Sequence, residues 1–401
     1  MALADYFDTL EIRSADARQA AQSRALAEQV AHARAHAPHY AGLPDGPLAT
    51  LPVTRKSDLL TQQAMNPPFG GVVAASFGQL ARIFASPGPI YEPEVAVPDY
   101  WRYARALHAT GLRSGELLHN CFAYHFTPAG SMLEGGARAL GCPVFPAGTG
   151  NTELQAQAAA QLRPRCYSGT PEYLKAILER GGELGLDLSS LKLGHVTGGA
   201  YLPTLRDWYA ERGLTVLQSY GTADLGLIAY ESPAREGLIL DEGIILEIVR
   251  PGTGDPVPDG EVGEVVVTTL NPHHPLIRFA TGDLSAILPG QSPCGRTNRR
   301  IRGWMGRADQ AAKIRGMFVR PEQVAAVLRA VPGVARARLI VSLHADRDTM
   351  LLRAEAPAEA ADALAKALQA VTKLRGLVEC VQPGILPNDG KVIDDTRPVP
   401  T

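Results

Sequence analysis

The sequence lacks features that mark several classes of protein. Its 401 residues include only five cysteines, which are scattered and form no CxxC pair. An odd, unpatterned set of this kind predicts reduced thiols and a cytoplasmic protein rather than a disulfide-stapled secreted one. No apolar run is long enough to span a bilayer, so we expect no membrane partner. The opening "MALADYFDTLEIRSADAR" carries acids early, which argues against a secretory signal.

An excess of basic charge is also missing. The formal net charge is −2 at pH 7, and no block of Lys and Arg occurs. Such a chain has no long-range attraction for nucleic acid, so we expect no nucleic-acid partner. With 45% hydrophobic and 20% charged residues, the composition is that of a globular protein. At roughly 100–200 residues per domain, the length predicts two or three domains.

Short apolar runs alternate with helical stretches between about residues 115 and 232. Runs such as "PRCYSG" and "LTVLQSYG" are separated by stretches such as "PEYLKAILERGG" and "LPTLRDWYAERG". Strand, helix and strand at this spacing predict βαβ units in a parallel sheet covered on both faces. Ligands of such sheets gather in the loops beyond the carboxyl ends of the strands. We expect "QSYGTADLGLIAYES" to be one of these loops, with Asp224 pointing out of it.

The pattern changes twice after residue 240. First, "GIILEIV" and "EVGEVVVTTL" flank a connector rich in Pro, Gly and Asp, which predicts antiparallel strands. After Asp309, a helix beginning at Pro321, a hairpin, a second helix and a strand follow. The predicted fold class is therefore α/β, with a large N-terminal domain over residues 1–308 and a small α+β C-terminal domain over residues 309–401. The large domain combines a parallel βα-sheet with antiparallel β elements.

Five stretches, in this order, resemble the adenylate-forming (AMP-binding) enzymes and, among them, the phenylacetate–CoA ligase branch. They are "VTGGAYLP" (196–203), "SYGTADLG" (219–226), "RFATGDLSAILPG" (278–290), "RRIRGWMGRADQAAKIRG" (299–316) and "PNDGKVIDD" (387–395). The resemblance also reaches "PVTRKSDL" and "FAYHFTPAG", so it spans nearly the whole chain. It implies an AMP-forming acid–thiol ligase. Such an enzyme joins a carboxylate to ATP, releases pyrophosphate, and passes the acyl group to coenzyme A.

The resemblance also assigns residues to these tasks. Asp224 matches the acid that holds Mg²⁺ on the phosphates, a cation that prefers oxygen ligands. Asp283 matches the ribose-binding acid, and Arg307 matches a residue that reaches ribose or phosphate. Lys391 matches the mobile lysine that bridges the carboxylate and the α-phosphate, and Asp309 matches the hinge between the domains. The alternatives are a turn-stabilising role for Asp224 and a solvated tail for Lys391.

Two further groups of residues follow from the resemblance. Around the nucleotide, the ring of Tyr220 would face adenine, and the chain would approach closely at Gly198, Gly199, Gly221 and Thr222. The walls of the acyl pocket would come from Tyr124, His125, Phe126, Ala200 and Tyr201. Flat apolar walls suit an aromatic or arylacetic acid, and the alternative for these aromatics is core packing. We assign no catalytic base to His125.

The chain departs from the family in its phosphate loop. The matching stretch, "FASPGPIYEPE" (84–94), has three prolines, each of which lacks a backbone donor. Glu92 adds a negative charge where phosphates would lie, and only Ser86 and Gly88 remain as usable donors. The Cys/His cluster that the branch often carries is absent, so we expect no zinc. Ala200 also replaces an acid of the family.

Three functions remain open on this sequence. The first is a carboxylate–CoA ligase that uses ATP, Mg²⁺ and coenzyme A. The second is a relative that binds or transfers an acyl-CoA or acyl-adenylate without making it. The third is an enzyme that loads an acyl carrier protein. Phenylacetate, benzoates, aminobenzoates and indoleacetate all suit an aromatic-walled pocket. A homodimer is a further expectation, because related folds often form dimers.

Overall fold

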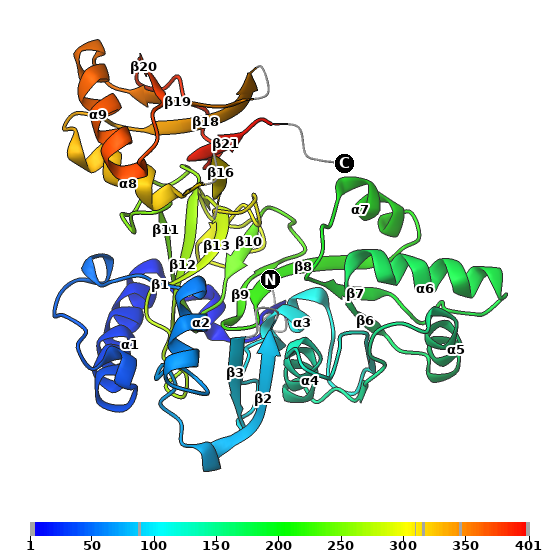
Figure 1. Cartoon of the computed structure of the whole chain (residues 1–401). Coiled ribbons are helices and arrows are strands. Elements are labelled where there is room, and N and C mark those ends of the chain that lie inside the picture. The colour runs from blue at the N-terminus through cyan, green and yellow to red at the C-terminus, as the bar shows by residue number, and fades with distance from the viewer. Residues whose placement is uncertain (1–4, 87–89, 309, 315–316, 345–346, 398–401) are drawn as a thin grey trace.

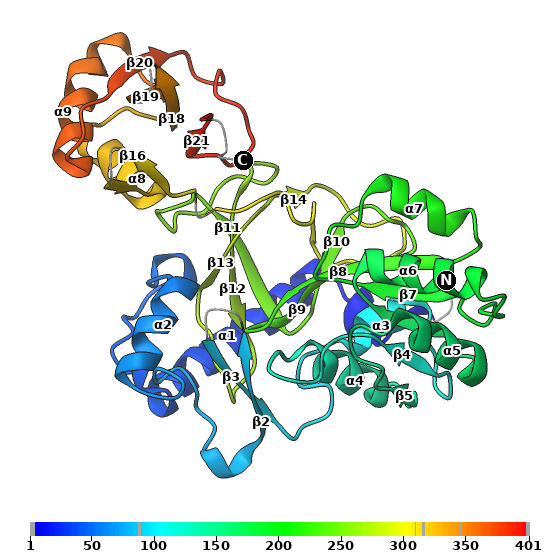
Figure 2. The same ribbon diagram turned by 45° about the vertical axis from the view of Figure 1, so that its right-hand side comes forward.

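A computed structural model describes residues 5–86, 90–308, 310–314, 317–344 and 347–397. Figure 1 shows a broad, helix-covered sheet at the right, and a second sheet beside α1 (Ala15–His36) and α2 (Lys56–Met65) at the left. A smaller module lies above both. The view in Figure 2 also places this module over the ends of β11 (Ile244–Val249) and β13 (Phe279–Ser285).

Within the described ranges, the broad sheet has nine strands in the order β14-β15-β10-β9-β8-β7-β6-β4-β5. The parallel strands are β4 (Leu118–Asn120), β5 (Val144–Phe145), β6 (Cys166–Gly169), β7 (Leu193–Val196) and β8 (Thr215–Thr222). The antiparallel strands are β9 (Gly226–Glu231), β10 (Leu238–Leu240), β14 (Ile287–Leu288) and β15 (Arg300–Ile301). The predicted parallel sheet is confirmed, because the neighbouring strands from β5 to β8 all pair in parallel.

Helices pack on both faces of this sheet. They are α3 (Ala104–Thr110), α4 (Ala129–Ala139), α5 (Thr152–Leu162), α6 (Pro171–Glu183) and α7 (Pro203–Ala210). One buried cluster joins Leu107 of α3 and Leu133 of α4 to Leu118 of β4. Another joins Leu174 of α6 to Val216 of β8. Burial on both faces explains why these strands read as continuous apolar runs.

The second sheet has the order β1-β13-β12-β11, with β1 (Thr54–Arg55) and β12 (Gly263–Thr269) as its other members. Strands β11 and β12 are antiparallel, as the runs on either side of the Pro/Gly connector predicted. A separate hairpin, β2 (Leu80–Ser86) and β3 (Ile90–Val95), lies between α2 and α3 (Figure 1). The stretch that matches the phosphate loop (84–94) includes the end of β2 and most of β3.

The C-terminal module has a hydrophobic core of its own. Its elements are β16 (Ala312–Ile314), β17 (Met317–Val319), α8 (Pro321–Ala330), β18 (Ala337–His344), β19 (Arg347–Glu355), α9 (Ala361–Thr372), β20 (Leu377–Val381) and β21 (Ile393–Asp395). Val327, Leu352 and Leu368 belong to one buried cluster drawn only from this part of the chain. The predicted fold class is confirmed. Among the described helices, none has the length and apolar character needed to cross a membrane.

Candidate active site

Asp224 lies in a tight turn between β8 and β9. The two strands pair antiparallel from Ser219 to Thr222, so the turn sits at the carboxyl end of the parallel strands. Gly221 is required in this hairpin, because a Cβ atom there would lie 2.5 Å from both the Tyr103 hydroxyl and the Gly226 carbonyl oxygen. We expected Asp224 to point out of a loop, but the residue is buried, with 3% of its surface exposed. The hairpin folds it inward, and a buried carboxylate needs a partner.

Lys56, the first residue of α2, supplies that partner. Its Nζ atom donates a hydrogen bond to Asp224 Oδ2 at 2.7 Å. The other carboxylate oxygen, Oδ1, is buried and has no hydrogen-bond partner within the described ranges. Asp224 is therefore fixed through one oxygen, while the other oxygen is buried without a hydrogen-bond partner in the described ranges.

Glu92 on β3 is a second buried carboxylate. It is 1% exposed, and it accepts hydrogen bonds from the Ser86 hydroxyl at 2.6 Å and from the Ser86 N–H at 3.2 Å. Burial, followed by the negative charge of Asp224, raises the pKa of Glu92 to about 8. The sequence left Ser86 as a usable phosphate donor, but in the structure both of its donors are engaged by Glu92. Gly88, the other expected donor, lies outside the described residues.

Asp283 on β13 is the centre of a second polar group. The Tyr220 hydroxyl donates to its Oδ2 atom at 2.8 Å. Trp304 Nε1 and Arg307 Nη1 donate to Oδ1 at 3.0 and 2.9 Å. Tyr220 is itself buried, and burial, together with the Asp283 charge, raises its pKa well above the usual value. Its ring thus presents little surface, whereas Trp304 and Arg307 reach Asp283 from the exposed side.

The loop carrying Lys391 is docked close to Asp283. Val262 N–H donates to Asn388 Oδ1 at 2.9 Å, and Gln310 Nε2 donates to the Gly390 carbonyl at 3.2 Å. Gly390 has a φ of 71°, and a Cβ atom there would meet Val262 at 2.7 Å and Leu284 at 3.0 Å. Glycine therefore lets the loop lie directly on Leu284, the residue after Asp283.

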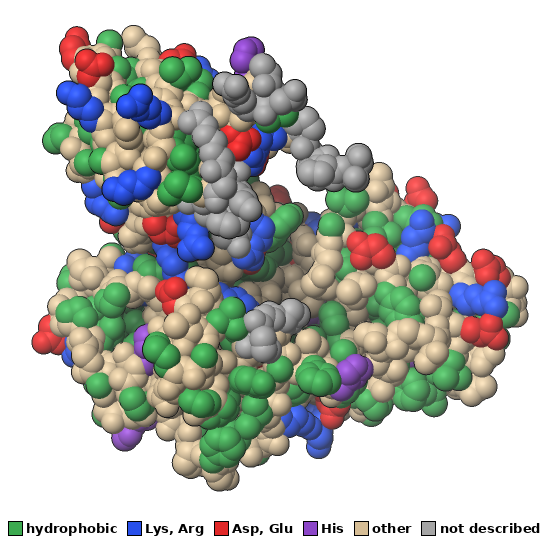
Figure 3. Space-filling view, viewed as in Figure 1, with side chains coloured by type: hydrophobic (Ala, Val, Ile, Leu, Met, Phe, Trp, Pro, Cys, Tyr) green, Lys and Arg blue, Asp and Glu red, His purple; other side chains and the backbone are tan. Residues whose placement is uncertain are grey.

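Figure 3 shows that the surface is hollowed between the C-terminal module and the larger part of the chain. A cavity of about 390 Å³ lies between this loop and that larger part. Arg307 and Gln310 line one part of it, and Lys391 and Asp394 line another. Lys391 Nζ lies 3.0 Å from Asp394 Oδ1, and its side chain is half exposed. The structure therefore brings Arg307 and Lys391, two of the predicted site residues, to the same cavity.

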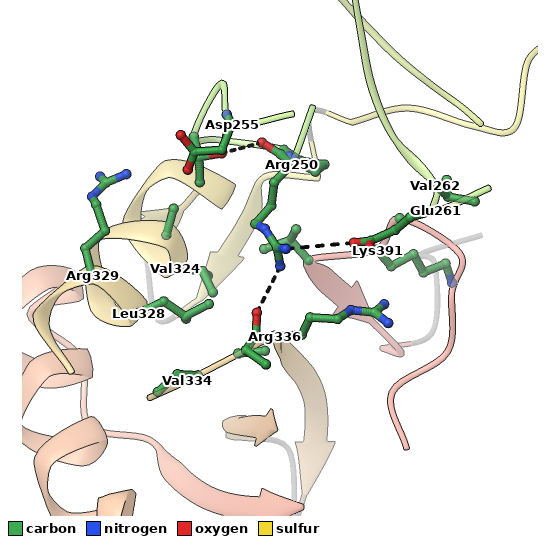
Figure 4. Close-up of a pocket in the computed structure, with 17 residues that line it drawn as sticks. Arg250, Asp255, Glu261, Val262, Val324, Leu328, Arg329, Val334, Arg336 and Lys391 are labelled. Carbon is green, nitrogen blue, oxygen red and sulfur yellow. Dashed lines mark hydrogen bonds and ion pairs between the residues drawn. The ribbon is translucent and has the colours of Figure 1, made fainter. Parts of the chain in front are cut away.

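Figure 4 shows a neighbouring cavity of about 280 Å³ between β11 and the C-terminal module. Arg250 lies at its centre. It donates from Nη1 to the Ala335 carbonyl at 3.1 Å and lies 3.9 Å from Glu261. Lys391 lines this cavity as well. Arg250 thus ties the C-terminal module to the β11–β12 connector in the arrangement that docks the Lys391 loop.

The residues expected around an acyl group are dispersed. The Tyr124 hydroxyl accepts a hydrogen bond from Asn120 Nδ2 at 2.8 Å and lies near α4. His125 is exposed, as is Phe126, with 77% of its surface accessible. Tyr201 instead packs in the cluster under α5, α6 and α7, with the Arg206 guanidinium 4.1 Å from its ring centre. Tyr201 and Tyr124 therefore belong to separate groups in this structure.

The remaining predicted residues lie around the same end of the sheet. Gly198, Gly199 and Ala200 are exposed after β7. Thr222 Oγ1 accepts a hydrogen bond from Leu225 N–H at 3.2 Å and so stabilises the Asp224 turn. Asp309, the expected hinge, lies outside the described residues.

Sequence reasoning did not assign roles to Lys56 or Trp304. Lys56 stands in "PVTRKSDL", but its partner is 168 residues away, and a lone lysine gives no sign of such a pair. Trp304 stands in "RRIRGWMGRADQ", where only Arg307 was singled out. Trp304 could have been noticed because it lies three residues before Arg307 and its indole N–H can donate one hydrogen bond.

A divalent cation fits Asp224 because its buried Oδ1 is unpartnered and is a hard oxygen ligand. The described residues contain no cluster of three or more His, Cys, Asp or Glu side chains that could hold a metal by themselves. A cation here therefore needs further ligands from a substrate or water. All five cysteines are free thiols, and Cys294 is buried 3.1 Å from the Ser292 hydroxyl.

Comparisons with known proteins show the family and the fold. The model of the AMP-binding enzyme family matches residues 102–271. The phenylacetate-coenzyme A ligase of Aromatoleum evansii is 31% identical over 90% of this chain and 89% of its own length. The Thermus thermophilus enzyme of the same name is 35% identical over 74% of this chain and 68% of its own. A crystal structure of 2-hydroxyisobutyryl-CoA ligase in an open conformation, in complex with 2-HIB-AMP and CoA, has a TM-score of 0.72 at 25% identity. The similarity covers 96% of this chain and 92% of that one.

The fold, the family match and the similarity to a solved CoA ligase define an AMP-binding enzyme of the adenylate-forming type. Within that class, the chain belongs to the family of the phenylacetate–coenzyme A ligases.

Proposed function

We propose that this protein is an ATP-dependent carboxylate–CoA ligase that acts through an acyl-adenylate. The observation that carries the proposal is the meeting of Arg307 and Lys391 at one cavity beside Asp283. A ribose-accepting carboxylate, a cation that can reach phosphate, and a lysine on a docked loop are the groups that adenylation needs. The family relatives, which are named phenylacetate-coenzyme A ligases, support the same reaction.

Asp283 would bind the ribose. Its Oδ1 atom is held by Trp304 and Arg307 from the exposed side, so two ribose hydroxyls would replace or join these donors. Tyr220 fixes Oδ2 from the buried side and keeps the carboxylate in one orientation. Gly198, Gly199, Gly221 and Thr222 would provide close backbone approach for the nucleotide.

Lys391 would act on the acyl phosphate. Its ammonium pairs with Asp394 at present, and exchange of this exposed pair for a substrate carboxylate and an α-phosphate oxygen costs little. A point charge fixed there stabilises the negative charge that develops as the acyl-adenylate forms. Rotation of the C-terminal module about Asp309 would then withdraw Lys391 before the acyl group passes to coenzyme A.

Asp224 would hold Mg²⁺ through Oδ1. When bound, this cation neutralises phosphate charge and orients the phosphates. Lys56 keeps Oδ2 occupied and so fixes the direction in which Oδ1 points.

The acid would be aromatic or arylacetic. Exposed Phe126 and half-buried Tyr124 precede the start of α4 and offer flat apolar surface near the end of β4. Tyr201, His125 and Ala200 would complete the pocket after movement of the loops that carry them. Coenzyme A is the proposed thiol acceptor. Transfer to an acyl carrier protein, and assembly as a homodimer, are further proposals from the same resemblance.

The test is product analysis with purified protein, ATP, Mg²⁺, coenzyme A and a panel of phenylacetate, benzoates, aminobenzoates and indoleacetate. Mass spectrometry should detect one acyl-CoA together with AMP. Addition of a holo-carrier protein in place of coenzyme A identifies the alternative acceptor. Binding of acids without any acyl-CoA, acylated carrier protein or AMP would refute the proposal.

One observation favours a second candidate function. Both donors of Ser86, the described residue expected to bind phosphate, are engaged by Glu92. A protein that binds or transfers an acyl-adenylate made elsewhere would not need to bind pyrophosphate. Calorimetry separates the two functions, because this candidate predicts tight binding of AMP and acyl-CoA but weak binding of ATP with Mg²⁺.

A further inference from the structure

The side-chain amide of Gln310 holds the backbone on both sides of Lys391. Its Oε1 atom accepts hydrogen bonds from the N–H groups of Val392 and Ile393 at 2.6 and 2.9 Å. Its Nε2 atom donates a hydrogen bond to the Gly390 carbonyl at 3.2 Å. One half-buried side chain therefore contacts the residue before Lys391 and the two residues after it.

These bonds lie at the outer edge of a sheet. Among the described strands, β21 is an edge strand in the order β20-β19-β18-β21, and Ile393 pairs with Leu339 on its inner side. The Val392 carbonyl accepts a hydrogen bond from Leu339 N–H at 2.8 Å, whereas the N–H of the same peptide, that of Ile393, points outward to Gln310. The outward N–H groups of an edge strand need a partner from outside the sheet. Gln310 is that partner, so it fixes the point at which the chain passes from Lys391 into β21.

The same amide also reaches across the expected hinge. Its Nε2 atom donates a second hydrogen bond, to the Arg307 carbonyl at 3.1 Å. Arg307 precedes the predicted hinge position, Asp309, and Gln310 follows it. The Arg307 side chain lies 2.9 Å from Asp283. A short series of contacts therefore connects the proposed ribose ligand to the loop that carries Lys391.

The ammonium of Lys391 is less constrained than its backbone. The side chain is half exposed, and Nζ lies 3.0 Å from Asp394 Oδ1. Asp394 also lies 3.7 Å from Arg338 Nη1, so the acid keeps a cation beside it when the lysine turns away. A fixed backbone with a movable ammonium suits a residue that exchanges one anionic partner for another.

We propose that Gln310 is a positioning residue for Lys391 in acyl-adenylate formation. It acts through the backbone of the loop and takes no part in the chemistry. The proposal rests on the proposed function, because the position of Lys391 matters only if the protein forms an adenylate. Loss of the amide would release the loop, and a misplacement of about 1 Å at a reacting centre can cost about 10²-fold in rate.

The test compares the two half-reactions of the full-length protein. Gln310→Leu removes both the donor and the acceptor at similar volume. It should slow acyl-adenylate formation by about 10- to 100-fold, as measured by quenched flow with ATP, Mg²⁺ and the acid that the wild-type protein activates. Transfer of the acyl group from a pre-formed adenylate to coenzyme A should keep the wild-type rate, because Lys391 is withdrawn before that step.

Gln323→Leu is the matched control. Gln323 is also half-buried and belongs to the same module, and its amide bonds the Arg320 N–H at 3.0 Å and the Val371 carbonyl at 3.5 Å. The change should leave the rates of both half-reactions at their wild-type values. Thermal unfolding of the variants shows whether each retains its fold. Gln310→Glu, which keeps an acceptor but loses the donor, serves if Gln310→Leu fails to fold, and a smaller loss of adenylation rate is expected.

Two further measurements separate positioning from a general disturbance of the module. In the Lys391→Ala background, Gln310→Leu should cause no additional loss of adenylation rate, because it acts only through Lys391. Without any substrate, the segment that contains Val392 and Ile393 should exchange its amide hydrogens faster in Gln310→Leu than in the wild-type protein.

Four outcomes overturn the proposal. They are a wild-type adenylation rate in Gln310→Leu, an equal loss in Gln323→Leu, a further loss when Gln310→Leu is added to Lys391→Ala, and unchanged hydrogen exchange. Failure of the proposed function gives a different result, because the wild-type protein itself would then form no adenylate. Hydrogen exchange would still show in that case whether Gln310 holds the loop.

Discussion

Lys56 Nζ lies 2.7 Å from Asp224 Oδ2 and joins the start of α2 to the β8–β9 turn. The carboxylate side chain is 1% exposed, whereas that of Lys56 is 31% exposed. The ion pair therefore neutralises a buried acid with a lysine that still reaches water. The same acid keeps one oxygen unpartnered, so one contact both stabilises the turn and orients a ligand atom.

Replacement of Lys56 by methionine should destabilise the fold by about 1–3 kcal/mol, because it leaves Asp224 buried without its partner. Urea unfolding measures this change. Asp224→Asn in the same background should recover part of the loss, as expected for two residues that interact directly. Arg163→Met is the control, since it breaks the exposed pair with Asp187 and should cost at most about 1 kcal/mol. If Lys56→Met and Arg163→Met lost the same free energy of unfolding, this account of the Lys56–Asp224 pair would be contradicted.

Asp283→Asn should weaken AMP binding by about 10- to 100-fold, the range for loss of hydrogen bonds to a charged group. Calorimetry with AMP and with its 2′,3′-dideoxy analogue makes the test specific. Wild-type protein should prefer AMP, and the variant should bind both ligands alike. Asp259→Asn, which removes an exposed partner of Arg299, provides the control. If the variant kept the wild-type preference for AMP, Asp283 would not be the ribose ligand.

Lys391→Ala should reduce acyl-adenylate formation by about 10²–10³-fold, the usual effect of removing one preorganised charge stabiliser. AMP binding should change little, because the lysine acts on the acyl phosphate and not on the nucleoside. Quenched-flow analysis of adenylate formation measures the rate. Lys366→Ala, on the exposed side of α9, should have no effect. An unchanged rate of adenylate formation in Lys391→Ala would contradict this role and indicate that the lysine is only a solvated surface residue.

Stability should fall as the pH is lowered from 6.5 towards 3, in part through His195. Burial lowers the pKa of this histidine to about 3, and both ring nitrogens are without partners among the described residues. Below its ordinary pKa the unfolded chain therefore binds a proton that the folded chain does not, and the free energy of unfolding decreases by up to about 1.4 kcal/mol per pH unit from this group. The free energy of unfolding, measured with urea between pH 7 and pH 4.5, should fall less steeply with decreasing pH in His195→Phe than in the wild-type protein. Identical slopes would contradict the prediction.

The sequence predicted the parallel sheet and its helices because their apolar runs repeat at regular spacing. It also placed the antiparallel β11–β12 pair, since the Pro/Gly connector excludes a helical crossover. The β8–β9 hairpin was harder to foresee. Gly221 and Gly226 permit a close approach of the two strands, but the same small residues also suit an open loop. That ambiguity explains why Asp224 was expected outside and lies inside.

The residues of the candidate site also divide into those that the sequence could predict and those that it could not. Asp283 and Arg307 stand in recognisable motifs, and the structure joins them at 2.9 Å. The Lys56–Asp224 pair depends on a contact across 168 residues, which no local pattern encodes. Glu92 was visible as an added charge, but its hydrogen bonds to Ser86 depend on the register of the β2–β3 hairpin.

The most direct test of adenylation is the exchange of labelled pyrophosphate into ATP in the presence of a carboxylic acid and Mg²⁺. The account predicts exchange that requires the acid, is saturable, and falls by about 10²–10³-fold in Lys391→Ala. Exchange that is absent for every acid the protein binds, while AMP still binds beside Asp283, would contradict it.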